Sequence, residues 1–126
     1  MAGLTLDAGA LIAAERGDRR FWALWKEAER RDVDITVPAP VVAQVYRGAR
    51  SAVISRVLSA CVVEPLDEAR ARRAGRLCGA SGTSDIADAA VVAGAASRRD
   101  DVVTSDPDDL ERLRRFAPGA GRLIVL

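Results

Sequence analysis

Short runs of aliphatic and β-branched residues alternate along this chain with longer amphipathic stretches, and this alternation constrains the fold more than any other feature. The short runs predict five strands, at residues 3–6, 34–37, 61–64, 101–104 and 122–126. Strands that alternate with helical segments are typical of βα units, which surround a parallel sheet with helices. We therefore predict a single α/β domain over residues 1–126, a three-layer α/β/α sandwich around a mostly parallel sheet of about five strands.

The amphipathic stretches predict the helices that connect the strands. They lie at residues 8–15, 18–31, 40–49, 51–59, 67–78, 85–97 and 107–115, and residues 81–84 predict a turn. The chain is 49% hydrophobic but only 4% aromatic, so aliphatic side chains must fill most of the core. We expect a contribution to that core from the residues Phe21, Trp22, Trp25, Val41, Val42 and Val45.

The chain contains no histidine, which excludes several kinds of active site. Serine–histidine–aspartate and cysteine–histidine nucleophiles are absent, as are zinc sites with histidine ligands and general bases that use imidazole. Two isolated cysteines, Cys61 and Cys78, are too few for a four-ligand metal site and do not resemble a secreted disulfide framework. We expect both to be small buried residues, and any catalysis must use carboxylates, hydroxyls or arginines.

Neither a membrane segment nor a secretion signal is predicted. No apolar stretch approaches the length needed to span a bilayer, and the apolar N-terminal residues are interrupted by Asp7 and lack a basic start. We therefore expect a cytoplasmic protein without membrane contact. The formal net charge is only +1, but Lys26 is the single lysine among 19 cationic residues. The arginines suit bidentate contacts with phosphate groups.

Four aspartates are candidates for chemistry because of where they stand. Asp7 and Asp106 each follow a predicted strand, and ligands of α/β sheets bind beyond the carboxyl ends of strands. Asp88 lies in an otherwise apolar helix, where a buried carboxylate should meet a cation. Asp85 starts the same helix. The alternative for Asp7, Asp85 and Asp106 is a helix N-cap, a position that aspartate favours.

These aspartates converge on one crevice if the first and fourth strands are neighbours in the sheet. Clustered carboxylates repel one another unless a cation lies between them. An oxygen-only ligand set without histidine or cysteine suits a hard ion such as Mg²⁺ or Mn²⁺. Such an ion activates water for attack on a phosphoryl group, so the residues permit a metal-dependent phosphodiester hydrolase.

Four segments, taken in order, resemble the PIN-domain ribonucleases, and especially the VapC-type toxins of toxin–antitoxin pairs. The segments are residues 6–13, 37–45, 85–92 and 103–110. The resemblance implies a PIN-like α/β/α fold and a Mg²⁺-dependent endoribonuclease that cleaves structured RNA such as transfer or ribosomal RNA. It also implies a small VapB-like antitoxin as a partner.

The resemblance also assigns the site residues one by one. Asp7 matches the first acidic residue of the family, Asp88 the helix acid and Asp106 the acid after the fourth strand, while Asp85 matches an additional acid of some relatives. Gln44 departs from the pattern, because the family usually has a glutamate there. The site therefore has one negative charge less than is usual and should bind divalent ions more weakly.

Other functions remain open at this stage. Arg16, Arg47 and Arg50 are candidate RNA contacts near the same crevice, although a solvated surface role is the alternative for each. A degenerate PIN domain that binds RNA or an antitoxin with little cleavage is the alternative to an enzyme. Exposed apolar residues would offer a groove for an antitoxin helix or the surface of a homodimer.

Other enzyme families with an aspartate after the first strand fit less well. Phosphoaspartyl phosphatases and receiver domains need a lysine in the site, and Lys26 lies within a predicted helix. A Rossmann nucleotide-binding domain would need a glycine-rich motif after the first strand, which is missing.

Overall fold

The centre of the sheet is formed by strands whose residues are buried on both faces. The computed structural model describes residues 2–126, and Met1 of the predicted domain lies outside them. Its strands are β1 (Leu4–Leu6), β2 (Ile35–Pro38), β3 (Val62–Glu64), β4 (Asp101–Thr104) and β5 (Leu123–Val125). They form one sheet in the order β3-β2-β1-β4-β5, and every neighbouring pair is parallel. The predicted α/β fold with five strands is confirmed.

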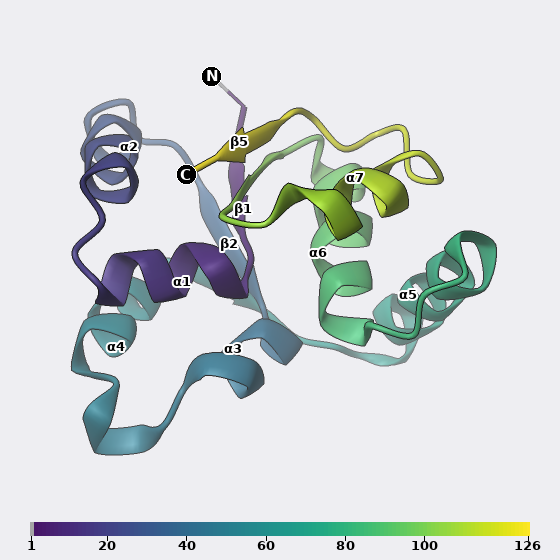
Figure 1. Ribbon diagram of the computed structural model, residues 1–126, viewed down its shortest axis with the longest axis horizontal. Helices are drawn as coiled ribbons and strands as arrows, with labels where there is room; N and C mark the ends of the chain where they lie inside the picture. Colours follow the sequence, from purple (N-terminus) through teal and green to yellow (C-terminus); the bar gives the residue numbers. More distant parts are fainter. Residues whose placement is uncertain (1) are drawn as a thin grey trace.

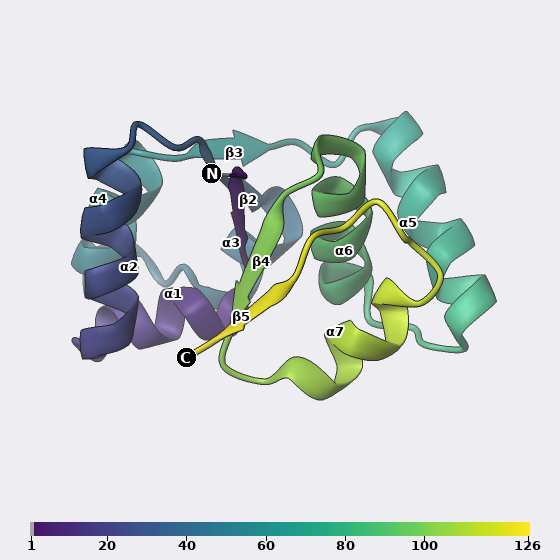
Figure 2. The same cartoon turned by 90° about the horizontal axis from the view of Figure 1, so that it is seen from above.

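Helices cover both faces of this sheet (Figures 1 and 2). On one side lie α1 (Ala8–Glu15), α2 (Arg19–Arg30) and α4 (Ala52–Ser59). On the other side lie α5 (Glu68–Ser81), α6 (Ile86–Arg98) and α7 (Pro107–Arg114). The short helix α3 (Ala39–Val45) follows β2 and contacts both α1 and α6. Alanine and valine dominate α6, and this helix packs against β1, β2 and β4 because its small side chains permit a close approach.

Two predicted helix ends were wrong. The helix predicted at residues 40–49 ends at Val45, because Tyr46 adopts an extended conformation, and a separate 3-10 turn, η1, follows at Gly48–Arg50. The helix predicted to end at residue 78 continues to Ser81 and ends at Gly82, whose φ of 77° suits glycine at a helix terminus. Ser81 is therefore helical and not part of a turn.

The predicted core is confirmed in part. Phe21 and Val41 are fully buried, whereas Trp22, Trp25, Val42 and Val45 are partly buried and pack against the core. Both cysteines are only partly buried, which corrects the expectation of buried residues. None of the helices in residues 2–126 has the length and apolar character needed to cross a membrane.

A buried ionic network joins strands and helices near the start of β4. Asp100 is 5% exposed, and its Oδ2 accepts hydrogen bonds from Thr5 Oγ1 at 2.8 Å and from Arg98 Nε at 2.9 Å. Arg98 also donates to Thr5 Oγ1 at 2.9 Å and pairs with Glu64 at the end of β3. The network thus ties β1, β3, β4 and α6 together, and every member has a partner of complementary charge or polarity.

Replacement of Asp100 by alanine should destabilise the fold strongly. Thr5 and Arg98 would each lose a partner inside the protein, and breaking a buried pair in this way costs about 3–5 kcal/mol. The free energy of unfolding in urea measures the loss. The control is Glu68→Ala, which removes the exposed Arg72–Glu68 pair and should cost at most about 1 kcal/mol. Equal losses in the two variants would contradict a stabilising role for the network.

Candidate active site

The pairing of β1 with β4 brings the candidate aspartates to one edge of the sheet. The chain runs from β1 through β2 to β3 on one side and then returns to place β4 on the other side of β1. The Asp7 backbone N–H donates to the carbonyl oxygen of Val103 at 3.2 Å. Ligands of α/β sheets bind at such a switch point, beyond the carboxyl ends of the strands. The expected adjacency of the first and fourth strands is confirmed.

Asp7 is buried and held in a fixed orientation at the start of α1. It is 6% exposed, and its Oδ1 accepts a hydrogen bond from the Ala10 backbone N–H at 2.8 Å. The pKa of Asp7 is raised above its usual value, mainly because burial disfavours the charge and also because Asp106 is nearby. Hydrogen bonds from Thr104 and Ala10 lower the pKa and oppose this effect. The N-cap interpretation of Asp7 is therefore confirmed, but the cap does not remove the cost of burying this carboxylate.

Gly9 permits the close approach of α1 to the loop after β4. A Cβ atom at Gly9 would lie 2.2 Å from Ser105 Oγ and 3.2 Å from the Ser105 backbone nitrogen. Any larger residue would push the first turn of α1 away from this loop. The glycine thus keeps Asp7 and Asp106 at the same edge.

Asp106 precedes α7, but its side chain does not cap the helix. Its backbone N–H donates to Thr104 Oγ1 at 3.0 Å, and the carboxylate is exposed. The N-cap interpretation that the Asp106-Pro107 sequence suggested is therefore wrong for the side chain. The carboxylate remains free for another role.

Asp85 and Asp88 lie together at the start of α6. Asp85 is a helix cap, as one interpretation predicted, because its Oδ1 accepts a hydrogen bond from the Asp88 backbone N–H at 3.0 Å. The pKa of Asp88 is raised to about 6, mainly because burial disfavours the charge and then because of the negative charges of Asp85, Asp7, Asp109 and Asp106, in that order of importance. We call these five aspartates the acidic cluster.

Asp109 was missed by the sequence analysis. It stands three residues after Asp106 in the first turn of α7, and residues at this spacing share one face of a helix. That spacing was the signal that could have revealed it.

No cationic side chain of residues 2–126 pairs with the acidic cluster. The cation that Asp88 was expected to meet is therefore not an arginine or lysine of this part of the chain, and a metal ion in that role remains a prediction. In the same part of the chain, no three acidic or cysteine side chains converge closely enough to hold a metal ion by themselves. The donors are nevertheless all carboxylate oxygens. Mg²⁺ suits such a site, since it keeps several waters and often takes only one or two carboxylates together with substrate phosphates.

Gln44 is exposed in the last turn of α3. Helix α3 contacts α1 and α6, which begin beside Asp7 and Asp88 respectively. This packing places Gln44 on an element next to the acidic cluster, and the role of its amide remains a prediction.

The three candidate arginines differ in position. Arg16 ends α1 at the terminus opposite Asp7, about 13 Å away along the helix axis, so it does not lie in the expected crevice. Arg47 folds back and donates to three backbone carbonyls around the end of α3, which stabilises that terminus. Arg50 is exposed in η1. RNA contacts by these arginines remain predictions.

Replacement of Asp88 by asparagine should stabilise the metal-free protein at neutral pH. The pKa of Asp88 is raised in the folded state. Between about pH 4 and about pH 6, the carboxyl group is therefore protonated in the folded protein but already ionised in the unfolded chain. Stability therefore falls as the pH rises through this range, and the asparagine variant avoids that loss. We expect a gain of about 1 kcal/mol at neutral pH, allowing for solvent screening of a half-buried group.

Urea unfolding in metal-free buffer at about pH 7.5 and about pH 4 measures this gain. The gain should vanish at the lower pH, where the carboxylate is protonated in both states. Asp108→Asn is the matched control, since Asp108 is exposed and does not contribute to the pKa of Asp88. A gain that persists unchanged at the lower pH would show a packing effect and contradict the electrostatic explanation.

Comparisons with known proteins place this chain in a family. The family model of the PIN domain matches residues 4–116. No curated protein sequence matches the chain.

Several solved structures share the fold. The chain is similar to VapBC2 from Rickettsia felis bound to a DNA fragment from their promoter, with a TM-score of 0.73, 12% identity and coverage of 98% of each chain. It is also similar to DNA-bound VapBC from Salmonella typhimurium, with a TM-score of 0.72 and 19% identity over 99% of this chain and 98% of that one. The chain is also similar to VapBC-5 from Mycobacterium tuberculosis, with a TM-score of 0.54 and 21% identity over 100% of this chain and 98% of that one. The sequence match over most of the chain and the shared fold lead to one conclusion: this chain belongs to the PIN domain family.

Proposed function

We propose that this chain is the toxin of a toxin–antitoxin pair and a Mg²⁺-dependent endoribonuclease that hydrolyses RNA phosphodiester bonds. The observation that carries the proposal is the acidic cluster, which lies at the carboxyl edge of a PIN-domain sheet without a protein cation. A set of carboxylates that repel one another costs stability, and a bound divalent cation would relieve the repulsion. A metal-dependent nuclease would account for the negative charge of the acidic cluster and for its position at the carboxyl edge of the sheet.

Asp7 and Asp106 are the proposed metal ligands, directly or through water, and Asp88 completes the anionic pocket. The hydrogen bond from Ala10 fixes the Asp7 carboxylate, while the exposed Asp106 carboxylate has no competing cap contact. Mg²⁺ or Mn²⁺, when bound, supplies an activated water and stabilises the charge that develops at phosphorus. Asp85 and Gln44 would orient waters at the rim.

RNA as a substrate is proposed from the resemblance to the PIN-domain ribonucleases. The phosphate backbone of RNA would be repelled by the acidic cluster alone, so substrate binding and metal binding should depend on each other. Structured RNA such as transfer or ribosomal RNA is the proposed substrate class. Arg47 and Arg50, on the chain that follows α3, are proposed to contact phosphates, whereas Arg16 would contact only RNA that extends along α1.

The proposed partner is a small VapB-like antitoxin. The structures with similar folds include VapBC complexes, in which toxin and antitoxin occur together. We further propose that the chain acts in the cytoplasm as a homodimer. The exposed apolar side chains of Tyr46, Val62 and Ile86 would be candidates for such contacts.

Asp7→Asn and Asp106→Asn should each abolish metal-dependent RNA cleavage. Asparagine is as good an N-cap as aspartate, so Asp7→Asn retains the start of α1 and removes only the charge. We expect a loss of about a hundredfold or more in the rate of Mn²⁺-dependent cleavage of a structured RNA. The Asp108→Asn variant should cleave as the wild type does. Wild-type protein that cleaves no RNA with either Mn²⁺ or Mg²⁺ would contradict the proposal.

Gln44→Glu should strengthen divalent ion binding by restoring the charge that the family usually has at this position. The thermal unfolding temperature of the wild type should rise with Mg²⁺ concentration, and the rise should begin at a lower concentration in the variant. The double variant Gln44→Glu/Asp7→Asn is the control and should lose most of this response. If Mg²⁺ stabilises neither protein, the alternative of a binding module without cleavage is favoured.

A further inference from the structure

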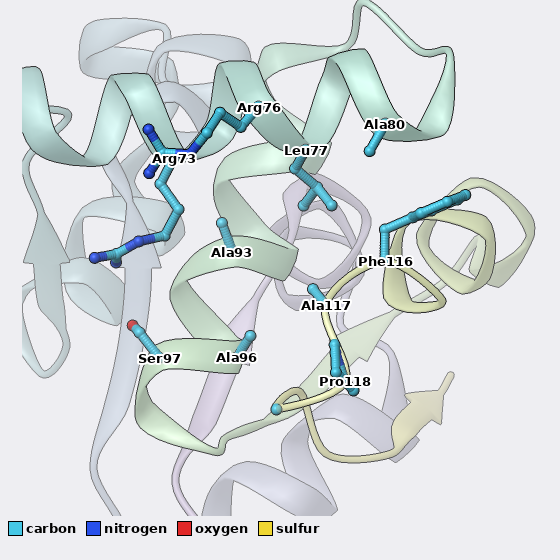
Figure 3. Close-up of a pocket in the computed structure, with 11 residues that line it drawn as sticks. Arg73, Arg76, Leu77, Ala80, Ala93, Ala96, Ser97, Phe116, Ala117 and Pro118 are labelled. Atoms are coloured by element: carbon cyan, nitrogen blue, oxygen red, sulfur yellow. The ribbon is translucent and has the colours of Figure 1, made fainter.

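A second surface of this chain has the form of a docking groove, and none of its lining residues belongs to the acidic cluster. It is a groove of about 500 Å³ between α5, α6 and the loop after α7, and Figure 3 shows its lining residues. Ala96 lies about 12 Å along α6 from Asp88, given the rise of a helix. We call this surface the α5–α6 groove, and its volume is typical of a ligand or peptide site.

The floor and one end of the α5–α6 groove are apolar. Leu77 of α5 and Ala93 of α6 are buried at the base, and Ala96 lies one turn further along α6. Phe116 lies at one end of the groove and is 50% exposed, although it is a large aromatic residue. An aromatic side chain that is half exposed beside buried aliphatic ones is a typical anchor of a protein interface.

The other end of the groove is cationic. Arg73 and Arg76 of α5 lie there, away from Phe116 (Figure 3). Their neighbours Arg70 and Arg72 form ion pairs with Glu64, Asp67 and Glu68, whereas Arg73 and Arg76 form none within residues 2–126. No acidic side chain of this part of the chain lines the groove. Two uncompensated arginines beside an apolar floor favour an acidic partner over a basic one.

The wall of the groove is preformed. The loop after α7 lies directly on α6, since a Cβ atom at Gly119 would come within 2.6 Å of the Ala96 carbonyl oxygen. Backbone hydrogen bonds from Phe116 to Leu113 and from Ala117 to Arg114 continue the end of α7 into this loop. A rigid wall reduces the entropy that binding would cost.

We propose that the α5–α6 groove binds an acidic, amphipathic segment of a protein partner, with apolar side chains against Leu77 and Phe116 and carboxylates against Arg73 and Arg76. The apolar floor favours a peptide over RNA, because bound RNA would place charged phosphates and polar ribose over alanine side chains. The proposal does not depend on nuclease activity. It describes a docking surface that can be occupied while the acidic cluster remains accessible.

Selection from a displayed library of random peptides, each long enough for about four helical turns, tests the proposal. Peptides selected on the wild-type protein should carry aspartate or glutamate beside leucine, phenylalanine or tryptophan. Their affinity should fall about tenfold or more for Arg73→Glu/Arg76→Glu and, separately, for Phe116→Ala. The charge-matched control is Arg19→Glu/Arg56→Glu, which alters exposed arginines that form no ion pair in residues 2–126 and lie on α2 and α4. This variant should bind the peptides as the wild type does.

Three results would overturn the proposal. The first is enrichment of peptides without acidic residues. The second is that the charge-matched control loses as much peptide affinity as Arg73→Glu/Arg76→Glu, which would show an unspecific charge effect. The third is that Arg73→Glu/Arg76→Glu weakens binding of a fluorescent single-stranded RNA but not of the selected peptides, which would make this an RNA surface. RNA cleavage by each variant, measured in parallel, separates failure of this proposal from failure of the nuclease proposal.

Discussion

The parallel pairing of β1 with β4 is the constraint on which the rest of the structure depends. It reverses the direction in which strands are added to the sheet, and ligands of α/β sheets bind outside the carboxyl ends of the strands at such a point. Asp7 comes one residue after β1, and Asp106 comes two residues after β4. The pairing of these strands therefore places both aspartates at the same edge of the sheet. The missing side chain at Gly9 then allows α1 to begin close to the loop after β4.

Two groups of acidic side chains in this chain have opposite environments. Asp100 and Glu64 are neutralised by Arg98 inside the fold, and this pairing stabilises the junction of strands and helices. The acidic cluster, in contrast, brings five carboxylates together and pairs none of them with a cation of residues 2–126. Burial, together with repulsion from the other carboxylates, raises the pKa of Asp88 to about 6, which means that the folded state carries an electrostatic cost at neutral pH. The unpaired carboxylates therefore do not stabilise the fold as the Arg98 network does, and this is consistent with the proposed role in metal binding.

The alternation of apolar runs predicted the fold because each strand is short and apolar, and the three central strands β1, β2 and β4 are buried. The sequence did not determine the sheet order, and the neighbouring positions of the first and fourth strands entered only as a condition, which the structure meets. Helix ends were less predictable, since the stop at Val45 depends on the extended conformation of Tyr46, and the continuation to Ser81 depends on the left-handed Gly82. Sequence reasoning placed Asp7, Asp85, Asp88 and Asp106 on the correct elements. It did not find the Arg98 network, because those contacts join residues that are up to 95 positions apart in the chain.

Helix α6 connects the two surfaces for which a function is proposed. Its first turn contributes Asp85 and Asp88 to the acidic cluster, and its later turns contribute Ala93 and Ala96 to the α5–α6 groove. The helix is buried along most of its length and packs against three strands, so it behaves as a rigid element between the two surfaces. A partner in the groove would therefore leave the carboxylates in place. Control of the active site from the groove would require a partner long enough to reach across the α5–α6 turn, and a short segment confined to the groove should bind without altering the acidic cluster.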